Sequence, residues 1–246
     1  MTPTENFISH LIELRTRLLR IVIGLVVVFV ALFPFANEIY SLLAAPLLTK
    51  LPMGGQMIAT GVTTPFFVPM KVAMMAAFLI SLPHTLYQVW AFVAPGLYAH
   101  EKRFMIPMIL FSSFLFLLGM SFAYFFVFPV VFGFIVGTAP EGVAVMTDIG
   151  NYLDFVMTLF FAFGLAFEVP IAVVMAVRFG WVGIPALRDA RGYVVVGAFV
   201  IGAIFTPPDI ISQFMLAVPM WLLYELGIIV AIFTKQKPAP TIQPPV

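Results

Sequence analysis

Long apolar stretches bounded by charged residues are the feature that most constrains this chain. A helix needs about 20 apolar residues to cross the hydrocarbon core of a bilayer, and six stretches reach or approach that length. Because backbone polar groups inside a bilayer must be hydrogen-bonded within their own segment, we predict that all six are helices. They comprise residues 21–37, 72–100, 104–140, 155–177, 192–208 and 210–234.

The composition supports a membrane protein and excludes several kinds of site. Hydrophobic residues make up 63% of the 246 residues and charged residues only 9%, against about 45–50% and 25% in soluble domains. Without Cys, disulfides and thiolate metal sites are impossible. The chain has neither a phosphate-binding G-x-x-x-x-G-K-[ST] loop nor an H-E-x-x-H zinc motif. We therefore expect no cofactor and no enzymatic activity.

The distribution of Lys and Arg predicts the orientation. With six spans, ten of these residues lie on one side and two on the other, which places the ten on the cytoplasmic side. If residues 104–140 held two spans, residues 178–191 would lie outside and this bias would disappear. We therefore expect one span there, with Pro129, Gly133 and Gly137 marking the start of an outer loop. The ten are Arg15, Arg17, Arg20, Lys102, Arg103, Arg178, Arg188, Arg191, Lys235 and Lys237, and the two are Lys50 and Lys71.

We thus expect an all-α integral membrane protein with six transmembrane helices and both termini in the cytoplasm. Residues 1–234 form a single membrane domain, and the proline-rich residues 235–246 form a disordered cytoplasmic tail. The last two spans look short. Residues 38–48 are predicted to form an amphipathic helix on the outer surface that ends near Pro46.

Two carboxylates on the predicted cytoplasmic side are candidates for function. Glu13 and Arg17 are four residues apart, and in a helix they would form an ion pair that stabilises it by about 0.2–0.5 kcal/mol. Alternatively, Glu13 accepts a cationic ligand at the membrane surface. Glu101 is either a solvated charge that balances Lys102 and Arg103 or a second such acceptor. The residues alone leave both interpretations open.

Glu168 lies inside a predicted span, about ten residues or 15 Å from Arg178. A carboxylate at that depth is costly unless it faces a cavity, has a partner or is protonated. Pro170 cannot donate to the carbonyl of Ala166 and is expected to kink the helix there. Glu168 is therefore either a functional group or one end of a buried structural hydrogen bond, whereas Asp209 is typical of a helix cap.

Four short motifs occur in a fixed order along most of the chain. They read His10-Leu11-x-Glu13-Leu14-Arg15-x-Arg17, then Tyr87-Gln88-x-Trp90-x-Phe92-x-x-Pro95-Gly96-Leu97-Tyr98-x-x-Glu101-Lys102-Arg103, then Gly164-x-x-Phe167-Glu168-x-Pro170, and finally Gly202-x-x-x-Thr206-Pro207-Pro208-Asp209.

With these motifs the chain resembles, over about residues 5–234, the TatC family, the multispanning receptor subunits of the twin-arginine protein translocase. The resemblance implies a bacterial inner-membrane receptor that binds signal peptides carrying two consecutive arginines and exports folded proteins. It also implies partner subunits of the single-span TatA and TatB type, self-association in a multi-copy complex, and energy from the proton-motive force.

The resemblance also assigns roles to residues. Signal-peptide binding falls to Glu13, Glu101, Leu14, Arg15, Arg17 and Phe92, and a polar intramembrane concavity to Glu168. Pro46 and Asp209 are implied as functional positions of the outer face, and Thr206 and Gln213 as positions where partner subunits dock.

Two other functions compete with this interpretation on the residues alone. The first is a proton-coupled transporter with Glu168 as its relay, although such folds usually contain inverted repeats and none is evident. The second is a membrane enzyme, for which no nucleophile and base are found as a pair. Uptake of a small solute by proteoliposomes would favour the transporter, and passage of a folded protein behind a twin-arginine signal would favour the translocase.

Overall fold

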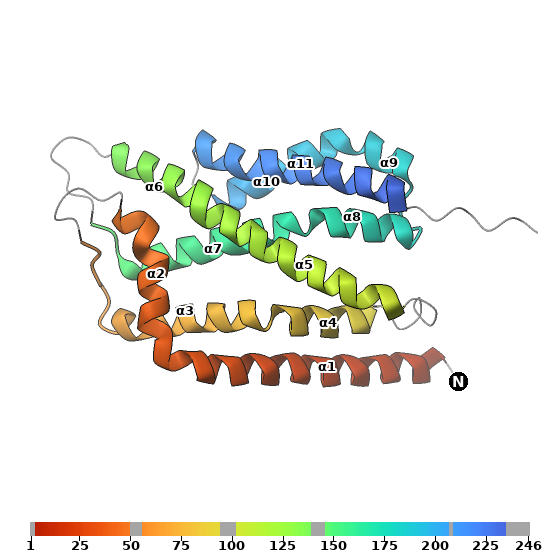
Figure 1. Ribbon diagram of the computed structural model, residues 1–246, viewed down its shortest axis with the longest axis horizontal. Coiled ribbons are helices and arrows are strands. Elements are labelled where there is room, and N and C mark those ends of the chain that lie inside the picture. The colour runs from red at the N-terminus through yellow and green to blue at the C-terminus, as the bar shows by residue number, and fades with distance from the viewer. Residues whose placement is uncertain (1–2, 50–55, 94–101, 139–145, 207–208, 235–246) are drawn as a thin grey trace, which may run out of the picture. The chain divides into compact units, whose positions relative to one another are not determined.

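In the computed structural model the chain is described over residues 3–49, 56–93, 102–138, 146–206 and 209–234, and most of this part is helical (Figure 1). A helix lies in each of the six stretches predicted above. The elements, in chain order, are α1 Pro3–Leu32, the 3-10 turn η1 Phe33–Phe35, α2 Ala36–Leu48, α3 Thr64–Ile80, α4 Leu82–Val93, α5 Lys102–Phe122, the π-helical turn η2 Ala123–Val127, α6 Phe128–Gly137, α7 Ile149–Phe167, α8 Val169–Arg178, α9 Ile184–Asp189, α10 Arg191–Phe205 and α11 Ile210–Thr234.

Four helical segments of the described chain are long and apolar enough to cross a membrane. They are Ile8–Leu48, Ile106–Gly137, Ile149–Arg178 and Ile210–Thr234, and the pair α3 and α4, bent by 57°, adds a fifth if it is one span. The prediction that the last two spans are short is correct for α10, with 15 residues, and wrong for α11, whose 25 residues extend about 37 Å. Apolar side chains continue α11 as far as Phe233.

The expected outer loop near Pro129 is also wrong, because the helix continues to Gly137. Pro129 is the second residue of α6 and has no N–H to donate to the preceding turn. The π-helical turn η2 comes directly before it, and there the N–H of Phe128 bonds to the carbonyl of Ala123. This wider turn lets α5, η2 and α6 follow one another without a break in the helical backbone.

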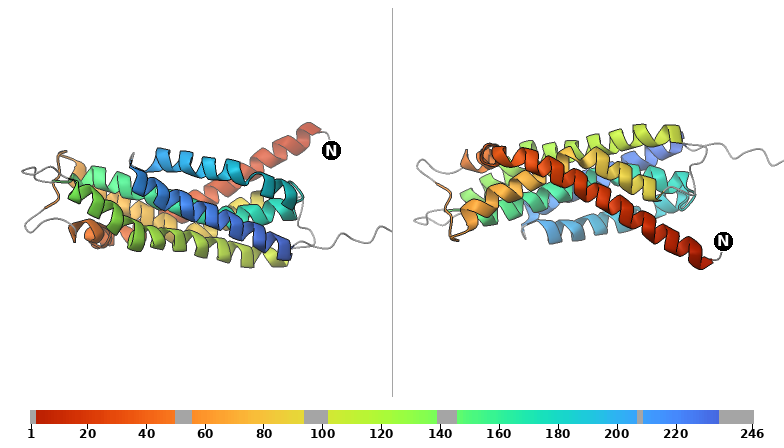
Figure 2. Two further views of the ribbon diagram at one scale, coloured as in Figure 1. Left: turned by 90° about the horizontal axis from the view of Figure 1, so that it is seen from above. Right: turned by 90° about the horizontal axis from the view of Figure 1, so that it is seen from below.

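The chain divides into two compact units, residues 1–164 and residues 165–246. In the first unit, α1 packs on α3 and α4, α2 packs on α3 and α6, and α4 packs on α5. Figure 1 shows α2 leaving the end of α1 at a steep angle, and Figure 2 shows the first turns of α1 extending past its neighbours in this unit. Phe128 is fully buried and contacts the rings of Phe132 and Phe160.

Pro46 lies inside α2 and is buried. Since proline has no N–H, the carbonyl of Leu42, four residues earlier, has no partner within the helix. The hydroxyl of Tyr124 donates to that carbonyl at 2.8 Å, and the hydroxyl of Tyr152 donates to the next one, that of Leu43, at 2.7 Å. Two tyrosines therefore hold the end of α2 in place, and α2 continues through Pro46 to Leu48 rather than ending there.

Asp148 joins two segments that are far apart in sequence. Its Oδ2 accepts hydrogen bonds from the backbone N–H of Thr60 at 2.9 Å and from the Thr60 hydroxyl at 2.7 Å. Its Oδ1 accepts from the backbone N–H groups of Gly150 and Asn151 at the start of α7. These bonds, above all that from the Thr60 backbone, lower the pKa of the Asp148 carboxyl to about 2. The carboxylate therefore stays charged, and this connection stays intact, well below neutral pH.

An ion pair links α3 to α7 along the surface of the same unit. The Lys71 ammonium lies 2.8 Å from Oδ1 of Asp154, and the two side chains are 48% and 61% exposed. Lys71 and Asp154 directly precede the predicted apolar spans 72–100 and 155–177. The pair therefore joins the same end of two spans through one charge-assisted contact.

In the second unit, α11 packs on α8 and α10, and α9 covers one end of this packing. Val173, Leu187, Tyr224 and Ile228 form its apolar centre. The Tyr224 hydroxyl donates to the carbonyl of Leu187 at 2.8 Å. Arg191 at the start of α10 pairs with Glu225 of α11 at 2.7 Å. A polar contact thus supports each side of the short helix α9.

Replacing Tyr124 by Phe removes the donor to the Leu42 carbonyl. We expect the free energy of unfolding in detergent to fall by about 0.6–1.5 kcal/mol, the usual range for one hydrogen bond of this kind. Thermal unfolding of the purified variant measures the change. The control is Tyr124→Phe in a Pro46→Ala background, where the alanine has an N–H that can bond to the same carbonyl. Tyr124→Phe should cost less stability in that background. An equal loss of unfolding free energy in both backgrounds would contradict this explanation.

Candidate functional site

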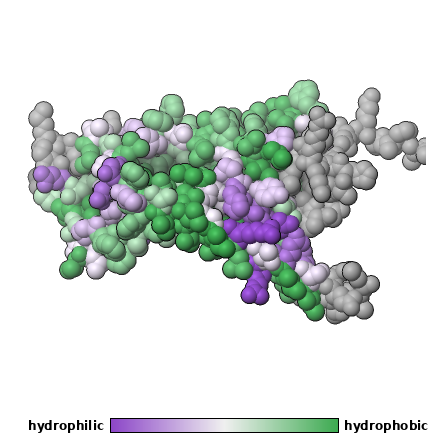
Figure 3. Space-filling view, turned by 60° about the horizontal axis from the view of Figure 1, so that its bottom comes forward, coloured by the Kyte–Doolittle hydropathy of each residue, from purple (hydrophilic) through white to green (hydrophobic). Residues whose placement is uncertain are grey.

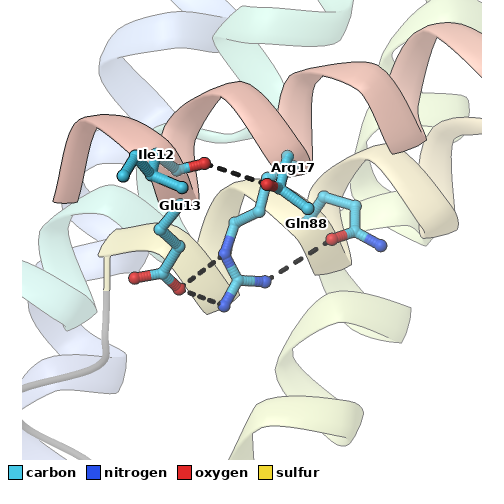
Figure 4. Close-up of polar contacts among 5 residues, drawn as sticks. Ile12, Glu13, Arg17 and Gln88 are labelled. Carbon is cyan, nitrogen blue, oxygen red and sulfur yellow. Dashed lines mark hydrogen bonds and ion pairs between the residues drawn. The ribbon is translucent and has the colours of Figure 1, made fainter. Parts of the chain in front are cut away.

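The charged group that the sequence singled out on α1 is a closed ion pair. Nε of Arg17 donates to Oε1 of Glu13 at 2.8 Å, and Nη2 donates to the same oxygen. Figure 4 shows the guanidinium turned toward the carboxylate, with its third nitrogen, Nη1, directed at Gln88 of α4. Nη1 lies 3.5 Å from Oε1 of Gln88. The predicted spacing of four residues therefore brings Glu13 and Arg17 together as expected.

The pair is positioned by the packing of α1 against α4. Further toward the N-terminus, the rings of His10 and Phe92 are stacked with their centroids 4.3 Å apart. Further along α1, Nε2 of His84 lies 3.2 Å from the carbonyl oxygen of Arg20. These contacts follow one another along two antiparallel helices, so Gln88 of α4 lies directly opposite Arg17 of α1. Gln88 is only 4% exposed, which holds its side-chain amide in place.

The remaining residues assigned to signal-peptide binding lie around this pair or outside the described chain. Leu14 and Arg15 are exposed on α1, and Phe92 is half-buried against His10. Glu101 falls outside the described residues. Figure 3 shows hydrophilic side chains gathered along the N-terminal part of α1, with hydrophobic surface beside them. The site is thus a polar patch at the end of an apolar helix.

Glu168 occupies the break between α7 and α8. The sequence predicts a kink beside Pro170, and at this point one residue interrupts the regular helix, since α7 ends at Phe167 and α8 begins at Val169. The backbone N–H of Glu168 donates to the carbonyl of Leu165 at 3.1 Å, and its carbonyl accepts from Ala172 at 3.0 Å. Its side chain is half-buried, with Oε1 inaccessible to solvent. A helix break and a carboxylate therefore coincide in the second unit.

The polar residues assigned to the outer face and to partner docking make contacts within their own unit. Oδ1 of Asp209 accepts from the backbone N–H of Ser212 at 2.7 Å and so caps α11. The Thr206 hydroxyl donates to the carbonyl of Gly202 at 2.8 Å, and Nε2 of Gln213 donates to the carbonyl of Phe199 at 2.9 Å. Gln213 thereby joins α11 to α10, beside the buried Gly202.

Gln88 was not singled out by reasoning from the sequence, although the structure places it beside Arg17. It is one of the few polar residues of α4 and lies 71 residues from Arg17 in the sequence. A polar residue in an apolar helix was a usable signal, but its partner was not readable from the local pattern. Among the described residues no three His, Asp or Glu side chains gather in a way that could hold a metal ion.

Known proteins similar to this chain agree on one family. The family model described as Sec-independent protein translocase protein (TatC) matches residues 9–219. The Sec-independent protein translocase protein TatC of Azotobacter chroococcum mcd 1 is 56% identical, over 90% of this chain and 87% of that protein. Its counterpart from Escherichia coli (strain K12) is 54% identical, over 92% and 87%.

Solved structures show the same fold. A crystal structure described as the twin arginine translocase receptor TatC superimposes with a TM-score of 0.78 at 38% identity, covering 91% of this chain and 98% of that one. A second, of the receptor in DDM, has a TM-score of 0.80 at the same 38% identity and covers 90% and 99%.

The packing beside Glu168 depends on Gly227 of α11. A Cβ at this position would lie 2.9 Å from Cα of Pro170 and 3.0 Å from Cβ of Val173. We expect Gly227→Ala to lower the free energy of unfolding by about 1–3 kcal/mol, because backbone must move to make room. Gly133→Ala is the control, since no heavy atom lies within 4 Å of its added Cβ. Thermal unfolding in one detergent compares them, and equal stability of the two variants would disprove the clash.

Proposed function

Because the chain belongs to the TatC family of Sec-independent protein translocase proteins, we propose that it is the receptor subunit that binds twin-arginine signal peptides. Binding takes place on the cytoplasmic side of the bacterial inner membrane. Together with single-span subunits of the TatA and TatB type, and in several copies, the chain exports folded proteins. The proton-motive force supplies the energy, and the chain itself catalyses no reaction.

The observation that carries this proposal is the way Glu13 holds a guanidinium. Two N–H donors of Arg17 converge on its carboxylate, which lies on the polar patch of α1 with the side chain one-third exposed. A carboxylate that binds the chain's own arginine in this way has the geometry needed to bind an arginine of a ligand. It is also accessible at the surface of the unit.

The chemistry favours arginine over lysine at such a carboxylate. A guanidinium is a planar fork of donors, whereas an ammonium is a compact, strongly hydrated charge. Each charge-assisted hydrogen bond contributes about 1.5–3 kcal/mol, so loss of one well-formed contact lowers affinity by roughly tenfold or more. Glu101 is proposed as the second acceptor, so that each carboxylate reads one arginine of the pair.

The other assigned residues lie around this proposed binding site or in other parts of the chain. Phe92, stacked on His10, and the exposed Leu14 supply apolar contacts beside the arginine pair, and Arg15 contributes to the basic face that the positive-inside rule places in the cytoplasm. Glu168, at the helix break, lines a polar concavity that admits the apolar stretch of the signal. Its position between α7 and α8 supports this role.

Two further sites are proposed for partner subunits and for the outer face. Thr206 and Gln213 mark the region of α10 and α11 where single-span subunits dock. The shortness of α10, about 22 Å for its 15 residues, supports local thinning of the bilayer there. Pro46 and Asp209 act on the outer face by holding the ends of α2 and α11, which the contacts of Tyr124 and Ser212 support.

Binding of a labelled twin-arginine signal peptide to the purified chain in detergent tests the receptor function. We expect Glu13→Gln to weaken binding at least tenfold, because one guanidinium loses its charged acceptor. A twin-lysine peptide should bind the unaltered chain at least tenfold more weakly. Glu38→Gln, on α2, is the control for loss of one carboxylate. Equal binding by all proteins and both peptides would rule out an arginine-reading carboxylate at Glu13.

Single cysteines test the six-span topology with both termini in the cytoplasm. The chain has no natural Cys, so no background substitutions are needed. Val62 is fully exposed between α2 and α3, and Trp181 is 67% exposed between α8 and α9. A membrane-impermeant maleimide should label Val62→Cys in intact spheroplasts and Trp181→Cys only after lysis. Labelling of both before lysis, or of Trp181→Cys alone, would contradict the topology.

A further inference from the structure

We propose that Arg17 is a built-in competitor for the arginine site at Glu13, and that Gln88 is the acceptor that receives Arg17 when a ligand displaces it. This inference rests on the proposed function, because it concerns the same carboxylate. It adds that the site is occupied by the chain's own guanidinium before a signal peptide arrives. Binding is then an exchange of one arginine for another.

The first step is that Arg17 already uses the donors that a ligand arginine would use. Nε and Nη2 both point to Oε1 of Glu13, one of them at 2.8 Å. The two side chains are only 19% and 33% exposed, so the pair is partly shielded from water. A second guanidinium cannot approach this oxygen with the same two donors while Arg17 remains. An incoming arginine that takes this oxygen with its own two donors must therefore displace Arg17.

The second step is that this competitor is always present. Arg17 lies one helical turn from Glu13 on the same helix, which keeps its guanidinium within reach of the carboxylate at all times. A tethered group of this kind acts at a high effective concentration that does not depend on the amount of protein. The apparent affinity for any ligand is then the intrinsic affinity multiplied by the fraction of molecules in which Glu13 is not paired with Arg17.

The third step is that Gln88 provides an acceptor for the displaced guanidinium of Arg17. Nη1 is 3.5 Å from Oε1 of Gln88, whereas a normal hydrogen bond of this type is about 2.7–3.2 Å long. A small rotation toward α4 shortens this contact and moves the guanidinium away from Glu13. Since Gln88 is 4% exposed and held in the packing of α1 against α4, it offers a fixed acceptor. The charge of Arg17 thus keeps a partner during the exchange.

The competition predicts a specific pattern of affinities. Ion pairs one helical turn apart are weak where water still reaches them, so removing Arg17 should tighten binding of a twin-arginine peptide only about two- to fivefold. Because the competitor blocks every ligand alike, a twin-lysine peptide should gain by the same factor. The ratio of the two affinities therefore stays constant, unlike in Glu13→Gln, where the ratio falls.

The experiment measures the dissociation constants of both peptides for the full chain in one detergent. Arg17→Gln is expected to tighten both by the same factor, and Arg17→Lys, which keeps the charge but lacks the fork, by less. Arg20→Gln, on the same helix, controls for loss of a positive charge and should change affinity less than Arg17→Gln. Gln88→Leu should weaken binding of both peptides, and this effect should vanish in the Arg17→Gln background.

The outcomes separate this inference from the proposed function. If Glu13→Gln leaves twin-arginine binding unchanged, both are overturned. If Glu13→Gln weakens binding but Arg17→Gln and Arg17→Lys fail to tighten it beyond the Arg20→Gln control, only the competitor is overturned, and Arg17 then supports the site instead. If Gln88→Leu has the same effect with and without Arg17, Gln88 is not the receiving acceptor. If the Arg17 variants do not fold, the Gln88→Leu variant alone decides. Twin-arginine peptide binding by Gln88→Leu that is unchanged or tighter would contradict the exchange.

Discussion

A backbone N–H or C=O group that lies in hydrocarbon must find its partner within the protein, and the 20 prolines of this chain make that requirement severe. The structure answers it in three different ways. At Pro46 a tyrosine hydroxyl from another helix takes the vacant carbonyl. Before Pro129 the backbone widens into a π-helical turn. Beside Pro170 the helix stops and starts again, with Glu168 at the break. The last of these also determines where Glu168 is placed.

The helices themselves were largely predictable from the sequence, because apolar length and the distribution of Lys and Arg are local properties. The break beside Pro170 was predictable for the same reason, since a missing N–H acts on its own turn. The continuation of the helix through Pro129 was not, because it depends on a widened turn that no residue pattern announces. The bounds of α11 were predicted correctly as 210–234, and only its description as short was wrong, since its 25 residues exceed the roughly 20 that a span needs.

The candidate site was predictable only in part. The spacing of Glu13 and Arg17 was sufficient to expect their ion pair, because four residues make one turn of a helix. The third member, Gln88, could not be found in this way, since its place beside Arg17 results from the packing of α1 against α4. The same holds for Arg191 and Glu225, and for Asp148 with Thr60. Contacts between segments far apart in sequence follow from tertiary packing, which local periodicity does not encode.

The ion pair between Lys71 and Asp154 has a consequence for how this chain responds to an electric field. A single charge moved across a membrane potential changes its energy by about 2.3 kcal/mol for each 100 mV. Lys71 and Asp154 lie 2.8 Å apart and carry opposite charges, so together they present no net charge. When α3 and α7 shift together, the voltage does no net work on this pair. The ion pair thus adds two charged residues at the edge of two apolar stretches without adding a net charge on which the voltage could act.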